Sequence, residues 1–238
     1  MILIIVITIN NLKRLKYNLY MNYNLIKPLV YIPLSDLCLC ILFTKKARWF
    51  QLHSLTNLVI LNIIKNDVYN LVINTNNSIT ILNNNEELYY IVILHLYHML
   101  FFKNTLMDYF HHFMFVLFGT IPIYYYYNIN LIRLATFVGC GLPGAIEYFT
   151  LSLVKHNKIS SLNQKKLMSN IYNYFRYPLG SYACSSIIIY YQQGYTPSIN
   201  LCTLVYTVFM IFFNGAYFNK LTIENKTWHS LSIQPVTK

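Results

Sequence analysis

Seven long apolar runs, separated by stretches rich in lysine, arginine and asparagine, constrain what this chain can fold into. A helix needs about 20 apolar residues to cross the hydrocarbon core of a membrane, where its backbone must satisfy its own hydrogen bonds. The first run is short, contains Pro33 and carries Asp36, so it is the least certain of the spans. The runs cover about residues 29–44, 48–64, 88–102, 106–127, 131–154, 172–191 and 199–218. This pattern predicts an all-α integral membrane protein, a bundle of six to seven transmembrane helices.

The composition excludes a soluble fold. Charged residues make up 11% of the 238 residues and hydrophobic residues 56%, whereas soluble domains carry about 25% charged residues. The net charge of +11 would suggest nucleic-acid binding in a soluble protein, but here the charges lie between the apolar runs. We therefore expect membrane lipids as partners and no nucleic acid. The five cysteines have no zinc-ligand spacing, so we expect no metal site.

The distribution of lysine and arginine predicts an orientation. If the runs cross the membrane alternately, basic residues at 45–48, 103, 155–176 and 220–238 fall on one side. Because positive loops stay in the cytosol, the C-terminus is expected to be cytosolic. Four basic residues near the N-terminus (Lys13, Arg14, Lys16 and Lys27) then lie on the opposite side. Either the first run is re-entrant, or the later helices dominate the topology.

Ionisable side chains inside the expected spans are the strongest functional signal, since each one is costly in a membrane. They are His53, His95, His98, His111, His112, Asp108 and Glu147, and Asn57 lies one turn from His53. Asp108 precedes the His111–His112 pair by three and four residues, so a helix puts all three on one side. A carboxylate there would orient a histidine that acts as a general base. The connection between the third and fourth runs is short, so the two histidine pairs are expected to meet. Packing between helices is the alternative explanation for these polar groups.

A second signal is the stretch Gly139-Cys140-Gly141-Leu142-Pro143-Gly144, with Glu147 one turn later. Glycine and proline together break or kink a helix and allow close helix packing. A broken membrane helix commonly lines a cavity.

These residues together resemble the TLC family, named for translocating-chain-associated membrane protein, Lag1-type ceramide synthases and the CLN8 protein. The resemblance rests on Arg48-Trp49 at the start of a span, His53 and Asn57 within it, Asp108-x-x-His111-His112, the pair Asn130 and Arg133, and Glu147. It implies a TLC-like domain over residues 45–220, preceded by an N-terminal segment with one helix (1–44) and followed by a short cytosolic tail (221–238). It further implies a lipid-sized cavity in the bundle and residence in the endoplasmic reticulum or a related endomembrane.

The resemblance also implies two possible functions. In the ceramide synthase branch the histidine pair is catalytic in acyl transfer from acyl-CoA to a sphingoid base, so His111, His112 and Asp108 would be the catalytic residues. That branch has further acidic residues where this chain has Leu142-Pro143-Gly144. We therefore expect lipid binding without catalysis or a cofactor, with His53, Asn57, His95, His98, Arg133 and Glu147 lining the cavity. Acyl transfer, with acyl-CoA as substrate, is the alternative. A di-metal lipid oxidase and a transporter or channel are weaker candidates.

Overall fold

The computed structural model describes residues 2–73, 80–82, 84–127, 129–194 and 199–231, with side chains of the first helix described from Tyr23 onward. About 89% of the chain is helical and the described residues form no strand. The helical segments are α1 (Ile2–Phe43), η1 (Lys45–Ala47), α2 (Arg48–Ile73), α3 (Glu86–Phe101), α4 (Leu106–His111), η2 (His112–Thr120), α5 (Ile121–Tyr126), α6 (Leu131–Thr136), η3 (Phe137–Gly141), α7 (Leu142–Lys155), α8 (Ser161–Ile171), η4 (Tyr172–Arg176), α9 (Tyr177–Gln192) and α10 (Leu201–Leu231). The all-α prediction is confirmed.

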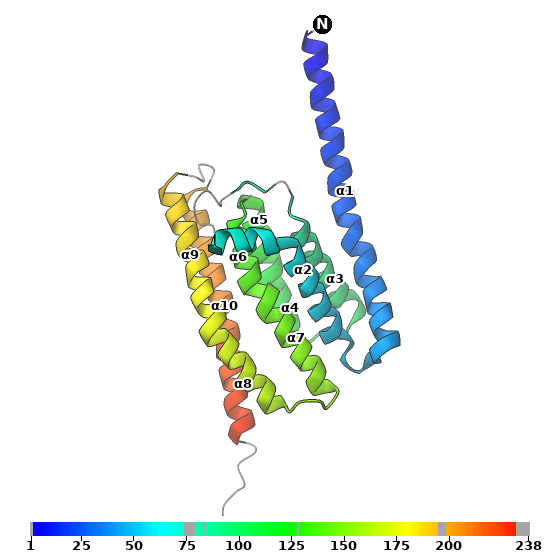
Figure 1. Cartoon of the computed structure of the whole chain (residues 1–238), viewed down its shortest axis with the longest axis vertical. Coiled ribbons are helices and arrows are strands. Elements are labelled where there is room, and N and C mark those ends of the chain that lie inside the picture. The colour runs from blue at the N-terminus through cyan, green and yellow to red at the C-terminus, as the bar shows by residue number, and fades with distance from the viewer. Residues whose placement is uncertain (1, 74–79, 83, 128, 195–198, 232–238) are drawn as a thin grey trace, which may run out of the picture.

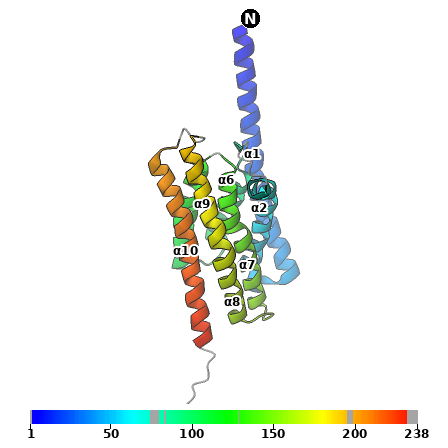
Figure 2. The ribbon, with the colours of Figure 1, turned by 60° about the vertical axis from the view of Figure 1, so that its left-hand side comes forward.

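Several of these segments join into longer helices that run side by side along the long axis of the molecule (Figures 1 and 2). The continuous helical stretches are α4–η2–α5, α6–η3–α7 and α8–η4–α9. The segments η2, η3 and η4 are π-helical turns within them. Helix α1 continues through Pro28 and Pro33 without ending, and it extends beyond the other helices at the N-terminal end (Figure 1).

Within the described residues, four helices are long and apolar enough to cross a membrane: Tyr23–Phe43, Leu106–Tyr126, Leu131–Lys155 and Leu201–Leu231. This supports an integral membrane protein. The other expected spans are also helical, but α3 has only 16 residues, or about 24 Å at 1.5 Å per residue. On α10 the outer face carries exposed apolar side chains at a helical spacing, Leu201, Val205 and Phe209, as a lipid-facing surface does.

Two polar segments contain helix. The basic stretch 155–170 lies between two of the apolar runs, where a loop is the simplest expectation, but Ser161–Ile171 is helical, and the Ser160 hydroxyl caps its start by accepting from the Asn163 N–H at 3.1 Å. Helix α10 continues to Leu231, into the segment 221–238 that is expected to be a cytosolic tail. Residues 232–238 lie outside the described part, as do the side chains of Lys13, Arg14 and Lys16.

Helix α1 is attached to the bundle by charged side chains. The Asp36 carboxylate, 2% exposed, accepts two hydrogen bonds from Arg48, one at 2.7 Å, and one from the Tyr97 hydroxyl at 2.7 Å. Higher on the helix, Lys27 pairs with Glu86 at 2.8 Å. Asp36 therefore has a structural partner on each neighbouring helix, which explains its presence in an apolar run.

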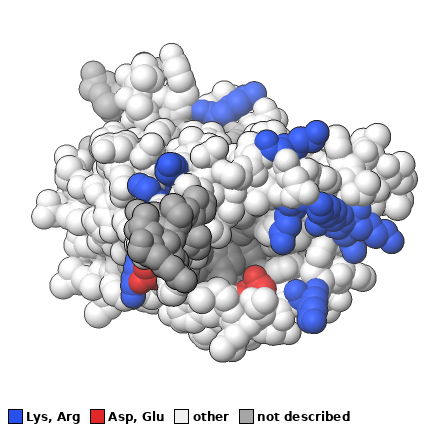
Figure 3. All heavy atoms as spheres, turned by 90° about the horizontal axis from the view of Figure 1, so that it is seen from below, with Lys and Arg blue, Asp and Glu red and all other residues white. Residues whose placement is uncertain are grey.

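Basic side chains gather at one end of the molecule. Figure 3 looks onto the end that carries η1 and the connection between α7 and α8, and the Lys and Arg side chains there greatly outnumber the Asp and Glu side chains. The basic segments therefore lie at one end of the fold, where Figure 3 shows them as several separate groups.

Candidate functional site

A pocket with a cavity volume of about 140 Å³ lies inside the bundle. Its lining comes from α2, α3, α4, the α5–α7 region, α10 and all three π-helical turns. The lining contains both apolar and polar side chains, and these two sets of residues are called the apolar wall and the polar wall. The apolar wall includes Phe115, Val116, Ile123, Ile132 and Met210; the polar wall includes His53, Asn57, His95, His111, Glu147, Tyr148, Tyr172, Arg176 and Asn214.

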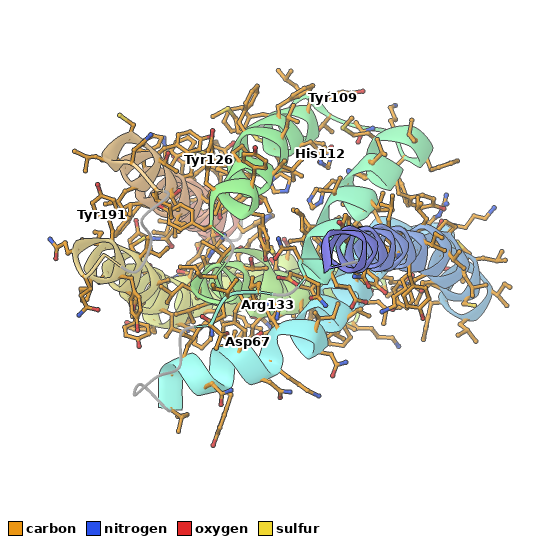
Figure 4. The ribbon with its side chains drawn as sticks, turned by 90° about the horizontal axis from the view of Figure 1, so that it is seen from above. Asp67, Tyr109, His112, Tyr126, Arg133 and Tyr191 are labelled. Atoms are coloured by element: carbon orange, nitrogen blue, oxygen red, sulfur yellow. The ribbon has the colours of Figure 1, made fainter. Side chains whose placement is uncertain are left out.

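The two expected histidine pairs meet between α3 and the α4–η2 helix. His95 Nε2 lies 3.3 Å from His111 Nε2, and His98 Nδ1 lies 2.9 Å from His112 Nε2. Figure 4 shows His112 directed from its helix toward α3. Of the four, His95 and His111 line the pocket, whereas His98 and His112 pair behind that wall.

The hydrogen bonds of the first pair assign the protons. His95 Nδ1 lies 2.7 Å from the Ile91 carbonyl oxygen, which only accepts, so Nδ1 carries the proton. In a neutral His95 ring Nε2 is then an acceptor, and His111 Nε2 must donate to it. This leaves the lone pair on His111 Nδ1, which has no hydrogen-bond partner in the described structure. His111 therefore offers a basic nitrogen that its protein neighbours do not use.

Aromatic stacking fixes the rest of the histidine cluster. The Trp49 indole stacks on His98, with ring centroids 3.6 Å apart, and His53 stacks on Tyr148 at 3.7 Å. Trp49 also meets the edge of His53. The start of α2 is thus packed against both α3 and α7.

Three polar atoms of pocket-lining residues lack partners. His53 Nδ1, Asn57 Nδ2 and His111 Nδ1 are buried and make no hydrogen bond to any described residue. Buried polar atoms in native proteins are almost always bonded to protein, water or ligand. These three atoms are therefore the places on the polar wall where the described residues leave a hydrogen bond unmade.

Asp108 does not form the expected contact with the histidines. Its carboxylate accepts from the Thr105 backbone N–H and the Thr105 hydroxyl, both at 2.7 Å, which makes it part of a capping box at the start of α4. It makes no hydrogen bond to His111 or His112 within the described residues. The spacing that suggested a carboxylate–histidine pair is satisfied by a helix cap instead.

Glu147 lines the pocket as expected, and glycines bring its helix close to α2. The Glu147 carboxylate accepts a hydrogen bond from the Tyr172 hydroxyl. A Cβ atom on Gly144 would lie 2.7 Å from Asn57 Nδ2, and one on Gly141 would lie 2.9 Å from the Leu61 side chain. The glycine-rich stretch therefore allows the close packing that places Glu147 and Asn57 on the same wall.

Arg133 lies outside the pocket lining. Its guanidinium binds the carboxylates of Asp67 and Glu87, the latter at 2.8 Å, and also Asn84. Figure 4 shows Arg133 between α6 and the neighbouring α2, which carries Asp67. This network joins α6, α2 and α3, so the residue expected to line a cavity holds helices together.

Among the polar residues of the pocket that sequence reasoning missed are Tyr148, Tyr172, Arg176 and Asn214. Arg176 was counted among the positive charges that set the topology. A signal was present, because Arg176 lies inside an aromatic run, Tyr172-Asn173-Tyr174-Phe175-Arg176-Tyr177, rather than beside other lysines. The two tyrosines and Asn214 have no distinguishing pattern.

The described residues contain no group of three or more His, Cys, Asp or Glu arranged to hold a metal ion. Comparisons of the chain with protein-family models, curated proteins and solved structures found no match. The TLC resemblance therefore stays a prediction from the motifs.

Proposed function

We propose that this chain is a TLC-type membrane protein that binds a membrane lipid in the pocket between its helices, without catalysis. One observation carries the proposal: the pocket is lined by both apolar and polar side chains, and three of the polar residues have a buried atom without a hydrogen-bond partner among the described residues. An amphiphile matches that division, because its chain contacts the apolar wall and its head group bonds the polar atoms.

The proposal includes a setting in the endoplasmic reticulum or a related endomembrane, with six to seven spans, a lipid-sized cavity and a cytosolic C-terminus. The TLC resemblance supports the compartment and the cavity. The basic face at the end that carries η1 supports the orientation, since positive loops favour the cytosolic side.

Filling the pocket tests lipid binding. A Cβ on Gly139 would meet no atom within 4 Å, and Gly139 lines both this pocket and a smaller one beside it, so Gly139→Leu puts a side chain into this region. Gly215 is equally open but lines only the smaller pocket, so Gly215→Leu controls for filling that second space. We expect mass spectrometry to find one lipid class enriched in the purified wild type and the control, and lost from Gly139→Leu. Wild-type protein that carries only bulk membrane lipids would contradict the proposal.

Acyl-CoA-dependent N-acyl transfer is the second candidate, favoured by the unbonded basic nitrogen of His111. In that reaction His111 Nδ1 would take a proton from the attacking amine. The assay is transfer from labelled acyl-CoA to a sphingoid base in microsomes from a host without its own ceramide synthase. Product that is lost in His111→Ala would establish the transferase. No product at verified expression would favour binding alone.

A further inference from the structure

Arg176 is a buried arginine on the polar wall of the pocket. It is 4% exposed and belongs to η4. Its Nη2 donates to the Gly139 carbonyl at 2.6 Å and to the Asn214 side-chain oxygen. The rings of Tyr172 and Phe218 lie 4.7 Å and 5.4 Å from its Cζ. Both rings and both acceptors are neutral.

Arg176 differs in this respect from the other two arginines whose side chains are described. Arg48 is paired with Asp36, and Arg133 with Asp67 and Glu87. Within the described part of the chain no carboxylate lies within ion-pair distance of Arg176, and its Nε and Nη1 donate to no described acceptor. Burying a guanidinium without a counter-ion is strongly unfavourable. The missing negative charge is therefore expected to come from outside the chain.

The nearest acidic group limits what that anion is. Glu147 is the one acidic residue among the described residues that line the pocket, and its carboxylate is bonded to the Tyr172 hydroxyl rather than to Arg176. A head group with two negative charges, such as a phosphate monoester, would meet repulsion from Glu147. A single carboxylate matches the fork of the guanidinium and carries the smaller charge.

The apolar wall and the volume of the pocket complete the description. A cavity of about 150 Å³ holds a six-carbon ring, and this pocket measures about 140 Å³. It therefore has room for a head group and the first carbons of a chain, with the rest of the chain beyond it.

We infer that the pocket binds an acyl-chain carboxylate, a fatty acid, whose anionic head group is held by Arg176. This inference rests on the proposed lipid-binding function and adds the chemical class of the ligand. The π-helical geometry is consistent with it, because η3 and η4 position the Gly139 carbonyl and Arg176 against each other at the pocket wall, and π-helical turns are frequent at functional sites.

The test compares an acid with its neutral analogue. Binding of radiolabelled oleate and oleyl alcohol is measured on the full chain in phosphatidylcholine nanodiscs, for wild type, Arg176→Met and Lys166→Met. The last variant removes an equal charge from an exposed position on α8. We expect Arg176→Met to weaken oleate binding by about tenfold or more and to leave oleyl alcohol binding within about twofold. Lys166→Met should bind both ligands as wild type does.

The other outcomes separate the two proposals. Wild type that binds neither ligand, or the alcohol alone, overturns the fatty-acid assignment, whereas the lipid-binding function itself fails only if the purified wild type carries bulk membrane lipids. Equal oleate affinity in wild type and Arg176→Met overturns the role of Arg176. If unlabelled lysophosphatidate displaces radiolabelled oleate at a much lower concentration than unlabelled oleate does, the head group that the pocket prefers is a phosphate rather than a carboxylate. Should Arg176→Met fail to fold, Arg176→Gln provides the same comparison with a polar side chain.

Discussion

The indole ring of Trp49 lies flat on the imidazole ring of His98, with the ring centroids 3.6 Å apart and the ring planes at 5°. His98 in turn lies 2.9 Å from His112. Trp49, which belongs to α2, therefore holds the pair His98 and His112 in place, while the other pair, His95 and His111, borders the pocket.

Replacing Trp49 by alanine should loosen the contact between α2 and α3. We expect Trp49→Ala to lower the free energy of unfolding by about 2–4 kcal/mol, because a half-buried aromatic ring is lost. Trp49→Phe should recover part of this loss. Thermal unfolding in detergent measures it, with Trp228→Ala as the control, since Trp228 is 75% exposed. An equal loss in both variants would contradict the stacking role.

The two histidine pairs should respond differently to substitution. His112→Ala leaves His98 Nδ1 buried without its partner, which we expect to lower stability by about 1–3 kcal/mol. In the double variant with His98→Ala, the two losses should be less than additive. His111→Ala should instead reduce the amount of lipid that co-purifies. Loss of lipid in His112→Ala at unchanged stability would reverse the assignment.

Breaking the Arg133 network should be among the most destabilising single changes. Arg133→Met leaves the carboxylate of Glu87, which is 0% exposed, and that of Asp67 without a cation, so we expect a loss of about 3–5 kcal/mol. Adding Glu87→Gln should recover part of it. Lys220→Met is the control, because Lys220 and Glu224 form an exposed pair worth less than about 1 kcal/mol. Chemical denaturation in detergent distinguishes the two.

A methyl group on Gly144 should separate α7 from α2. Because its Cβ would lie 2.7 Å from the buried Asn57 amide, Gly144→Ala should displace Asn57 and lower stability by about 1–3 kcal/mol. Gly215 on α10 has open space at the same position, so Gly215→Ala should be neutral or stabilise by up to about 1 kcal/mol. A Gly144→Ala variant as stable as wild type would exclude the close packing described here.

The sequence predicted the helices and the meeting of the histidine pairs because both depend on local spacing. His95 and His98 are one turn apart, His111 and His112 are adjacent, and the four-residue connection between α3 and α4 makes the helices neighbours. The number of membrane spans was less predictable. Helix α3 has only 16 residues, and the second half of α2 is polar, so neither helix is among those that are long and apolar enough to cross a membrane.

The partners of the charged groups could not be read from spacing. Asp108 lies three residues before His111 and three residues after Thr105, so its spacing allows a contact with either residue. In the structure its carboxylate accepts from Thr105 and forms part of the helix cap. Arg133 and Arg176 look alike in the sequence, each near the start of an apolar run. Only tertiary packing brings two carboxylates to Arg133 and none of the described carboxylates to Arg176.

The three π-helical turns have a consequence for how this bundle tolerates change in length. Each wide turn holds one residue more than a regular helical turn, and successive residues of an α-helix point about 100° apart. Deleting one residue from Phe137–Gly141 would let the wide turn close into regular α-helix, and the residues after it would face nearly as they do now. The same deletion in the regular part of α7, ahead of Glu147, would instead rotate Glu147 and Tyr148 away from the pocket by that angle. The wide turn therefore makes this helix tolerant of losing one residue at that place and at no neighbouring one.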